Sequence, residues 1–186
     1  MIIAIDFGGT NIKIGLVEEG KVLAQSRLPS FSEQGLIPRL AVVQEEIGAL
    51  LKQQGADLAG CSGIGIATPG IVDTDRRAIL SINEKYADAV GFDLEEWARH
   101  AFGLPFRIEN DARAALLGEA HYGAARGVKD AVLLTFGTGI GTSAMMNGRV
   151  LRGKHYQAGI LGGHFTTNVN GNLCNCGSKG CLEAQA

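Results

Sequence analysis

A pattern of strand, glycine turn and strand occurs twice in this chain of 186 residues. Short apolar segments flank Gly8-Gly9 near the start of the chain, and two more flank Gly137-Thr138-Gly139. The four segments are residues 2–6, 12–18, 131–135 and 141–146. Glycine turns between such segments are typical of hairpins. The repetition predicts that a second domain restarts the first.

The segments between the two repeats alternate between helix and strand patterns. Strands are expected at residues 21–27, 62–68 and 106–109, and helices at residues 33–54, 93–102 and 111–122. Asp93 is the expected N-cap of the second helix, and Pro38 the expected kink of the first. Hairpins followed by this alternation predict an α/β fold with a mixed sheet and flanking helices. We expect domains at 1–122 and 123–186, the second incomplete.

Composition excludes several classes of protein. A content of 46% hydrophobic and 19% charged residues is typical of an ordinary globular protein. A net charge of -2 argues against a nucleic-acid surface. The N-terminus lacks the basic flank and long apolar stretch of a secretory signal, and no apolar run reaches the roughly 20 residues needed to span a bilayer. We expect a cytoplasmic protein without a membrane or nucleic-acid partner.

The two glycine turns are candidate phosphate-binding loops. Glycine lets backbone N–H groups approach phosphate oxygens, and a neighbouring threonine adds a hydroxyl donor. Asp6, at the end of the first strand, is a candidate for holding a hydrated magnesium ion. The predicted nucleotide-binding residues are therefore Asp6, Gly8, Gly9, Thr10, Gly137, Thr138 and Gly139. Each turn taken alone is better explained as a simple hairpin turn, and only the two together favour phosphate binding.

A cysteine cluster near the end of the chain predicts a metal site. Cys174, Cys176 and Cys181 lie within eight residues, and His164 precedes them after two glycines. Three thiolates and one imidazole match a closed tetrahedral zinc site, which would be structural. The alternative is a set of reduced surface thiols, with His164 not a ligand.

These motifs together resemble the ROK family (repressor, open reading frame, kinase). The resemblance rests on Asp6-x-Gly8-Gly9-Thr10, Glu109-Asn110-Asp111-Ala112 with Gly118-Glu119, Gly137-Thr138-Gly139-Ile140-Gly141, and Cys174-x-Cys176-Gly177-x-x-Gly180-Cys181-x-Glu183. It implies an actin-like ATPase (ribonuclease H-like) fold. It also implies transfer of the ATP γ-phosphate to a hydroxyl of a hexose or N-acylhexosamine, and a homodimer at full length.

Within that resemblance, Asp111 is the predicted general base. A carboxylate at a helix start directly after a strand is kept ionised by the helix N-terminus and can accept the proton of a sugar hydroxyl. On position alone it would be an ordinary helix-terminal acid. The sugar contacts that the resemblance implies are Gly70, Asn83, Asn110, Asp111, His164 and Glu183. Asn83 has a simple turn as its alternative role.

Two departures from the family pattern leave other functions open. Leu161 stands where the family usually has a glutamate, so the choice of sugar is in doubt. The sequence ends before the expected remainder of the second domain, so we expect this chain alone to be inactive. The alternatives are a non-catalytic sugar-binding protein and a sugar-responsive regulator. A helix-turn-helix domain, expected ahead of the first strand in a regulator, is missing from this sequence.

Overall fold

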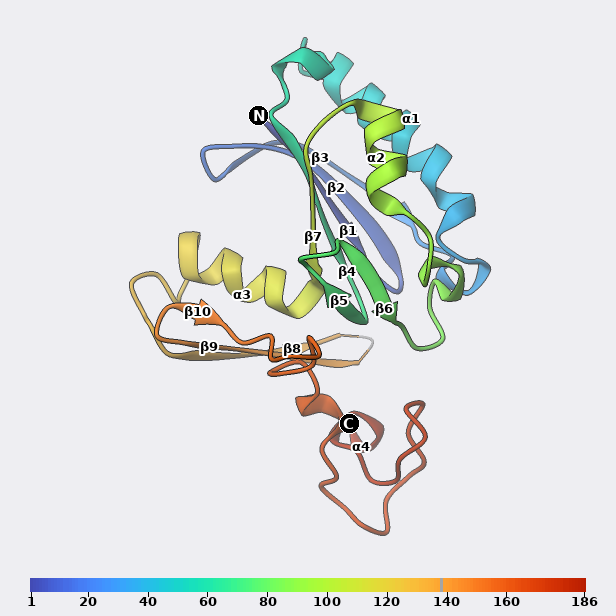
Figure 1. The fold of residues 1–186 in the computed structure, drawn as a ribbon, viewed down its shortest axis with the longest axis vertical. Helices are drawn as coiled ribbons and strands as arrows, with labels where there is room; N and C mark the ends of the chain where they lie inside the picture. Colours follow the sequence, from blue (N-terminus) through green and yellow to red (C-terminus); the bar gives the residue numbers. More distant parts are fainter. Residues whose placement is uncertain (138) are drawn as a thin grey trace. The chain divides into compact units, whose positions relative to one another are not determined.

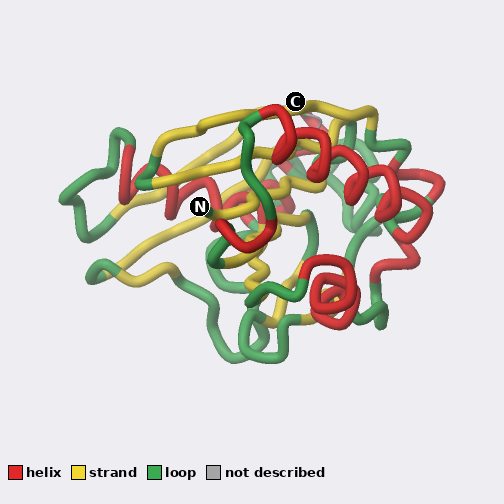
Figure 2. Tube along the Cα trace, turned by 90° about the horizontal axis from the view of Figure 1, so that it is seen from above, coloured by secondary structure: helices red, strands yellow, loops and turns green. Residues whose placement is uncertain are grey.

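The elements of the chain fall into two compact units, Met1–Asn110 and Asp111–Ala186. They are described here from a computed structural model that covers residues 1–137 and 139–186. The path of the chain is shown in Figure 1, and its helices, strands and loops can be followed by colour in Figure 2. The units divide before the helix that starts at Asp111, whereas the sequence boundary at 122 and 123 stays a prediction about domains.

The first unit is built on a mixed sheet of five strands in the order β3-β2-β1-β4-β7. The strands are β1 (Ile2–Phe7), β2 (Asn11–Glu18), β3 (Lys21–Pro29), β4 (Gly63–Thr68) and β7 (Phe106–Asn110). The first three pair antiparallel, while β1, β4 and β7 run parallel. The hairpin between β2 and β3 turns at Glu19 and Gly20, both with positive φ (48° and 78°). This backbone twist suits a tight hairpin.

One face of this sheet carries the core. The register aligns Leu16, Ile3, Ile64 and Phe106 in one row across four strands, and Ile14, Ile5, Ile66 and Ile108 in the next. All eight side chains are at most 5% exposed. Helices α1 (Ile37–Gln53) and α2 (Leu94–Phe102) contribute their buried apolar residues to the same cluster and lie on the same side of the sheet (Figure 1). Burying this surface is the main force that holds the unit together.

The two helices begin for different physical reasons. Helix α1 starts at Ile37 and not at residue 33, and Pro38 lies in its first turn, where a missing N–H costs nothing and no kink results. Ser32–Gln34 form a separate 3₁₀ turn, η1. Helix α2 is capped as predicted, because the Asp93 carboxylate accepts the N–H of Glu96 at 2.8 Å.

The second unit combines helix α3 with a small antiparallel sheet. Helix α3 (Asp111–Tyr122) packs on strands β8 (Ala131–Phe136) and β9 (Ile140–Met146), and the short β10 (Arg149–Val150) completes the sheet in the order β10-β9-β8. Beyond it the chain forms a 3₁₀ turn, η4 (Gly162–His164), and a short helix, α4 (Leu182–Gln185). Among the described residues, no helix has the length and apolar character to cross a bilayer.

Three short strands and two 3₁₀ turns are among the elements that sequence analysis missed. These strands are β10 and the hairpin of β5 (Ile71–Asp73) with β6 (Ala78–Ser81). The two turns are η2 (Leu58–Gly60) and η3 (Ala87–Ala89). Two to four residues per element are too few for a periodic pattern to be recognised.

Candidate active site and metal centre

The carboxyl ends of the parallel strands bring several predicted residues to one edge of the first unit's sheet. Strand β1 runs into Gly8-Gly9, β4 into Pro69-Gly70, and β7 ends at Asn110. Asn110 is 4% exposed, and its Nδ2 donates to the carbonyl oxygen of Gly70 at 3.0 Å. Gly70 has φ +95°, and a Cβ there would lie 2.3 Å from the Ser81 carbonyl oxygen. Ligands of open α/β sheets bind at this edge.

Three hydroxyl groups hold the first glycine turn. The Oγ atoms of Ser30 and Ser32 donate to the Gly9 carbonyl at 2.6 and 2.8 Å, and the Tyr86 hydroxyl donates to the Gly8 carbonyl at 2.9 Å. All three side chains are buried. In a trans peptide the carbonyl and the following N–H point in opposite directions. The N–H groups that follow these two carbonyls therefore point away from the hydroxyls.

Tyr86 is the most deeply buried of the three. It is 0% exposed and packs edge-to-face against Phe7, with the ring centroids 5.9 Å apart. Burial raises the pKa of its phenol to about 12, so the hydroxyl stays protonated and remains a donor. Sequence analysis missed all three hydroxyl residues, because each lies outside the glycine motif and forms no pattern with it.

The other predicted residues of the first unit are more exposed. The Asp6 carboxylate pairs with Lys13 at 3.1 Å, and its side chain is 35% exposed. Thr10 is exposed, as is Asn83, whose backbone carbonyl accepts the Lys85 N–H at 2.6 Å. Asp6 is thus partly charge-compensated before any cation binds.

Asp111 is the first residue of helix α3 in the second unit. Its side chain is exposed, and Oδ1 accepts the N–H of Ala112 at 2.8 Å. The N–H of Ala112 and the helix N-terminus both place positive partial charge beside this carboxylate. The predicted position of this residue at a helix start is confirmed, whereas its catalytic role stays a prediction.

Arg113, two residues later, anchors the start of this helix. It is 0% exposed, and its Nε donates to the Leu151 carbonyl at 3.0 Å. Its Nη2 donates to the carbonyls of Tyr156 and Ala158, both at 2.9 Å. Hydrogen bonds from a charged donor are stronger than neutral ones. Arg113 therefore fixes the segment that leads toward His164, a role that sequence analysis did not assign.

The second glycine turn is bound by Glu183. Gly137 donates to the Gly139 carbonyl at 3.0 Å, and Thr138 lies outside the described residues. Oε2 of Glu183 accepts the N–H of Ile140 at 2.8 Å. A Cβ on Gly139 would lie 2.3 Å from that oxygen, so only glycine leaves room for this carboxylate. The structure thus brings a predicted sugar contact to a predicted phosphate turn.

The four predicted metal ligands converge in the second unit. The ligand atoms of His164, Cys174, Cys176 and Cys181 all lie within 4.8 Å of one another. Nδ1 of His164 is 3.6 Å from Sγ of Cys174, and Sγ of Cys176 is 3.6 Å from Sγ of Cys181. A tetrahedral zinc ion with Zn–S bonds of ~2.3 Å holds its sulfur ligands about 3.8 Å apart. The donor set and its spacing therefore fit zinc.

The backbone around these ligands is folded by short turns. Gly177 and Gly180 have φ of +86° and +70°, and a Cβ on Gly180 would lie 1.6 Å from the Asn168 carbonyl oxygen. Burial raises the pKa of the Cys181 thiol to about 12, and the neighbouring thiols add to this. A backbone hydrogen bond from Ser178 instead lowers the pKa of Cys176. The two thiols thus differ in their surroundings. Cys181 is desolvated, whereas Cys176 accepts a hydrogen bond.

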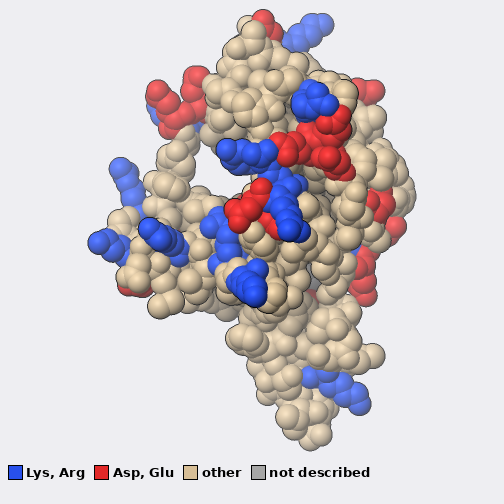
Figure 3. Space-filling model, viewed as in Figure 1, with Lys and Arg blue, Asp and Glu red and all other residues tan. Residues whose placement is uncertain are grey.

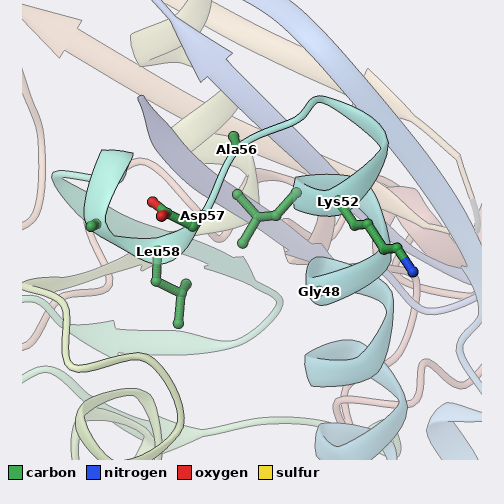
Figure 4. Close-up of a pocket in the computed structure, with 7 residues that line it drawn as sticks. Gly48, Lys52, Ala56, Asp57 and Leu58 are labelled. Atoms are coloured by element: carbon green, nitrogen blue, oxygen red, sulfur yellow. The ribbon is translucent and has the colours of Figure 1, made fainter.

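Three further surface features lie outside the set of predicted site residues. A pocket of about 540 Å³ in the first unit is formed by the end of α1 and by η2, and it contains none of the predicted site residues (Figure 4). On the face shown in Figure 3, basic and acidic side chains are interspersed. Leu161, which replaces the expected glutamate, is 37% exposed.

Comparison with known proteins finds similarity to glucokinases and to a xylose repressor. The chain is 35% identical to a glucokinase from Thermotoga maritima over an alignment of 189 positions that covers 100% of this chain and 56% of that protein. It superposes on a ROK family glucokinase from Streptomyces griseus, solved with glucose and AMPPNP, with a TM-score of 0.79 and 31% identity, over 98% of this chain and 55% of that one. A xylose repressor from Bacillus subtilis is 35% identical over 127 residues, 68% of this chain and 32% of the repressor.

The chain thus spans little more than half the length of the two glucokinases. The fold prediction is confirmed, because the mixed sheet with flanking helices matches the fold of the ROK kinases over nearly the whole chain. The sequence profile of the ROK family matches residues 2–186. This protein is a member of the ROK family.

Proposed function

We propose that this chain forms part of an ATP-dependent sugar kinase that phosphorylates a hydroxyl of a hexose or N-acylhexosamine. The observation that carries the proposal is Asp111, an exposed carboxylate at the start of helix α3 in a chain that matches the ROK family over residues 2–186. The similarity to glucokinases supports the same class of reaction.

In this mechanism Asp111 accepts the proton of the sugar hydroxyl while that oxygen attacks the γ-phosphorus of ATP. The bond from the γ-phosphorus to the bridging oxygen breaks, and ADP leaves with the electron pair. Magnesium, bound with the nucleotide, would neutralise phosphate charge, and Asp6 is the residue we assign to its hydrated shell. The residues assigned to the phosphates are Gly8, Gly9, Thr10, Gly137, Thr138 and Gly139.

The residues that we assign to sugar binding, in addition to Asp111, are Gly70, Asn83, Asn110, His164 and Glu183. His164 can serve two sites, because Nδ1 faces Cys174 and leaves Nε2 for a hydroxyl. In Glu183, Oε2 holds the glycine turn, and Oε1 is the atom we assign to the sugar. Leu161 cannot pair with a hydroxyl, so we expect discrimination among sugars to differ from that of a relative with glutamate there.

We further propose that the Cys₃His cluster binds a structural zinc ion through His164, Cys174, Cys176 and Cys181. The fit of the donor set supports this assignment. With four protein ligands the ion has no open position for catalysis. Its contribution would be to fold residues 162–186.

The function is tested with a protein that includes the rest of the second domain. ADP release is measured across a panel of sugars for the wild type and Asp111→Asn. We expect the substitution to reduce turnover by about 10²–10⁴-fold, because the base is lost, while calorimetry finds the sugar still bound. Near-normal turnover in Asp111→Asn would refute the assignment of the base.

A non-catalytic sugar-binding protein or regulator is the second candidate. Leu161 in place of glutamate and the similarity to a xylose repressor favour it. It predicts that the wild type binds a sugar without releasing ADP. The same panel therefore separates the two functions.

A further inference from the structure

The side chain of Lys85 lies against the first glycine turn. A Cβ built on Gly9 would lie 2.7 Å from Cε and 2.8 Å from Nζ of Lys85. The space that glycine leaves open at this position is therefore filled by an ammonium group. Lys85 and Gly9 both belong to the first unit, and they are far apart in sequence.

The backbone on either side of Lys85 is held in an unusual conformation. Glu84 and Tyr86 have φ of 59° and 52°, in the left-handed region that non-glycine residues rarely adopt. Two hydrogen bonds of Tyr86 anchor this segment. Its backbone N–H donates to the Ser32 carbonyl at 2.7 Å, and its hydroxyl donates to the Gly8 carbonyl. Strain of this kind persists where the surroundings fix it, and it gathers at ligand-binding sites.

The charge of Lys85 is not balanced within the first unit. Among the six ion pairs present in residues 1–137 and 139–186, none includes Lys85, and the nearby Asp6 carboxylate is paired with Lys13. Lys85 as a whole residue is half-buried. A cation without an ionic partner attracts an anion, and the adjoining turn has its N–H groups directed away from the hydroxyls of Ser30, Ser32 and Tyr86.

We propose that Lys85 binds the terminal phosphate of the nucleotide at the first glycine turn. A lysine ammonium is a compact point charge that suits phosphate oxygens. It would stabilise the negative charge carried by the phosphoryl group during transfer. This assignment rests on the proposed kinase function and adds a cationic group to it.

The test compares Lys85→Met with Lys85→Arg in the protein that includes the rest of the second domain. Methionine keeps most of the length of the side chain and removes the charge. We expect kcat/KM for ATP to fall by about 10- to 100-fold in Lys85→Met, with sugar affinity unchanged and partial retention in Lys85→Arg. Lys52→Met, at an exposed lysine on α1, is the matched control and should behave as the wild type.

A binding measurement separates failure of this inference from failure of the kinase proposal. Calorimetry with AMPPNP and with adenosine is run on the same variants. Lys85→Met should weaken AMPPNP binding and leave adenosine binding unchanged, whether or not any sugar is phosphorylated. Equal AMPPNP affinity and kcat/KM within two-fold in a folded Lys85→Met protein would overturn the inference.

Discussion

At the scale of the residue, the buried side chain of Tyr86 holds the first glycine turn in place. Its hydroxyl is the donor to the Gly8 carbonyl, and its ring is packed against Phe7. A buried carbonyl that loses its donor costs roughly 1–3 kcal/mol. The tyrosine therefore supports both the stability of the unit and the direction of the turn.

Tyr86→Phe is predicted to change how stability depends on pH. In the unfolded chain the phenol ionises near pH 10, whereas burial raises its pKa in the folded protein to about 12. Between these values the unfolded state loses the proton first, so the free energy of unfolding falls as pH rises. We expect a loss of about 1.4 kcal/mol per pH unit from this group, measured by urea unfolding from pH 9 to 12.

The phenylalanine variant should be less stable at neutral pH. Its free energy of unfolding should not show the decrease that ionisation of Tyr86 causes above pH 10. Tyr122→Phe, at a tyrosine that is 70% exposed, is the control for losing a hydroxyl. The interpretation fails if the wild type and Tyr86→Phe show the same alkaline slope.

Single residues were predictable where a local rule governs them. The Asp93 cap follows from one helix start, and the first position of Asp111 follows from the end of one strand. Ser30, Ser32, Tyr86 and Lys85 reach the glycine turn through space, from two separate segments. No spacing rule connects such residues, so sequence reasoning could not find them.

At the scale of the element, residues 163–183, which include the candidate metal ligands, contact the second glycine turn on both sides of one residue. Glu183 accepts the N–H of Ile140, and a Cβ on Gly163 would lie 2.2 Å from the Ile140 carbonyl oxygen. Gly163 precedes the candidate ligand His164, and Glu183 follows Cys181 by two residues. The two ends of residues 163–183 thus lie against the N–H and the carbonyl of Ile140, at the start of β9.

Glu183→Ala is predicted to free the N–H of Ile140. Because hydrogen bonds to charged acceptors contribute about 1.5–3 kcal/mol, amide exchange at Ile140 should rise by roughly ten-fold or more. Glu183→Gln, which keeps an oxygen acceptor, should lie between the alanine variant and the wild type. Exchange is followed by NMR on this chain, with metal content measured in parallel.

Glu119→Ala provides the matched control within the same unit. Oε2 of Glu119 accepts the N–H of Ala124 at 2.7 Å, so its loss should raise exchange at Ala124 and leave Ile140 unaffected. Unchanged exchange at Ile140 in Glu183→Ala, with the metal retained, would contradict the role of this contact.

Elements were predictable in proportion to their length. The long strands and α2 and α3 were expected within a residue or two of their bounds, because each carries several periods of its pattern. The start of α1 was wrong by four residues, since the polar residues of η1 carry no apolar period that could separate a 3₁₀ turn from the first turn of a helix. The hairpin of β5 and β6 gave no recognisable signal at all.

At the scale of the whole molecule, metal binding should decide whether the second unit is ordered. Elemental analysis is expected to find about one zinc per chain. Because binding of a structural metal is coupled to folding, chelation should cost several kcal/mol and lower the melting midpoint of this unit by roughly 10 °C or more. Hydrogen exchange should rise in residues 162–186 and remain slow in β1, β4 and β7.

Cys176→Ser is the variant that tests the same point without a chelator. It removes one of four ligands at the most exposed position of the cluster, and it should lose zinc at a chelator concentration that the wild type resists. A metal-free wild-type protein with full protection in residues 162–186 would exclude a structural metal.

The overall architecture followed from the sequence because hairpins and helix–strand alternation leave few arrangements of a sheet. The metal cluster followed from spacing alone, and its four ligands do converge. The identity of the sugar did not follow. It depends on how side chains such as Leu161 and Asn83 meet a ligand, and that is decided by shape and not by motif.

The buried arginine gives α3 a mechanical property. Since Arg113 binds carbonyls of Leu151, Tyr156 and Ala158, the helix cannot rotate without drawing that stretch along with it. A displacement of the carboxylate at position 111 would thus be transmitted as a pull on the backbone ahead of η4. A movement of the first turn of α3 would therefore be accompanied by a movement of residues 151–158, which Arg113 binds.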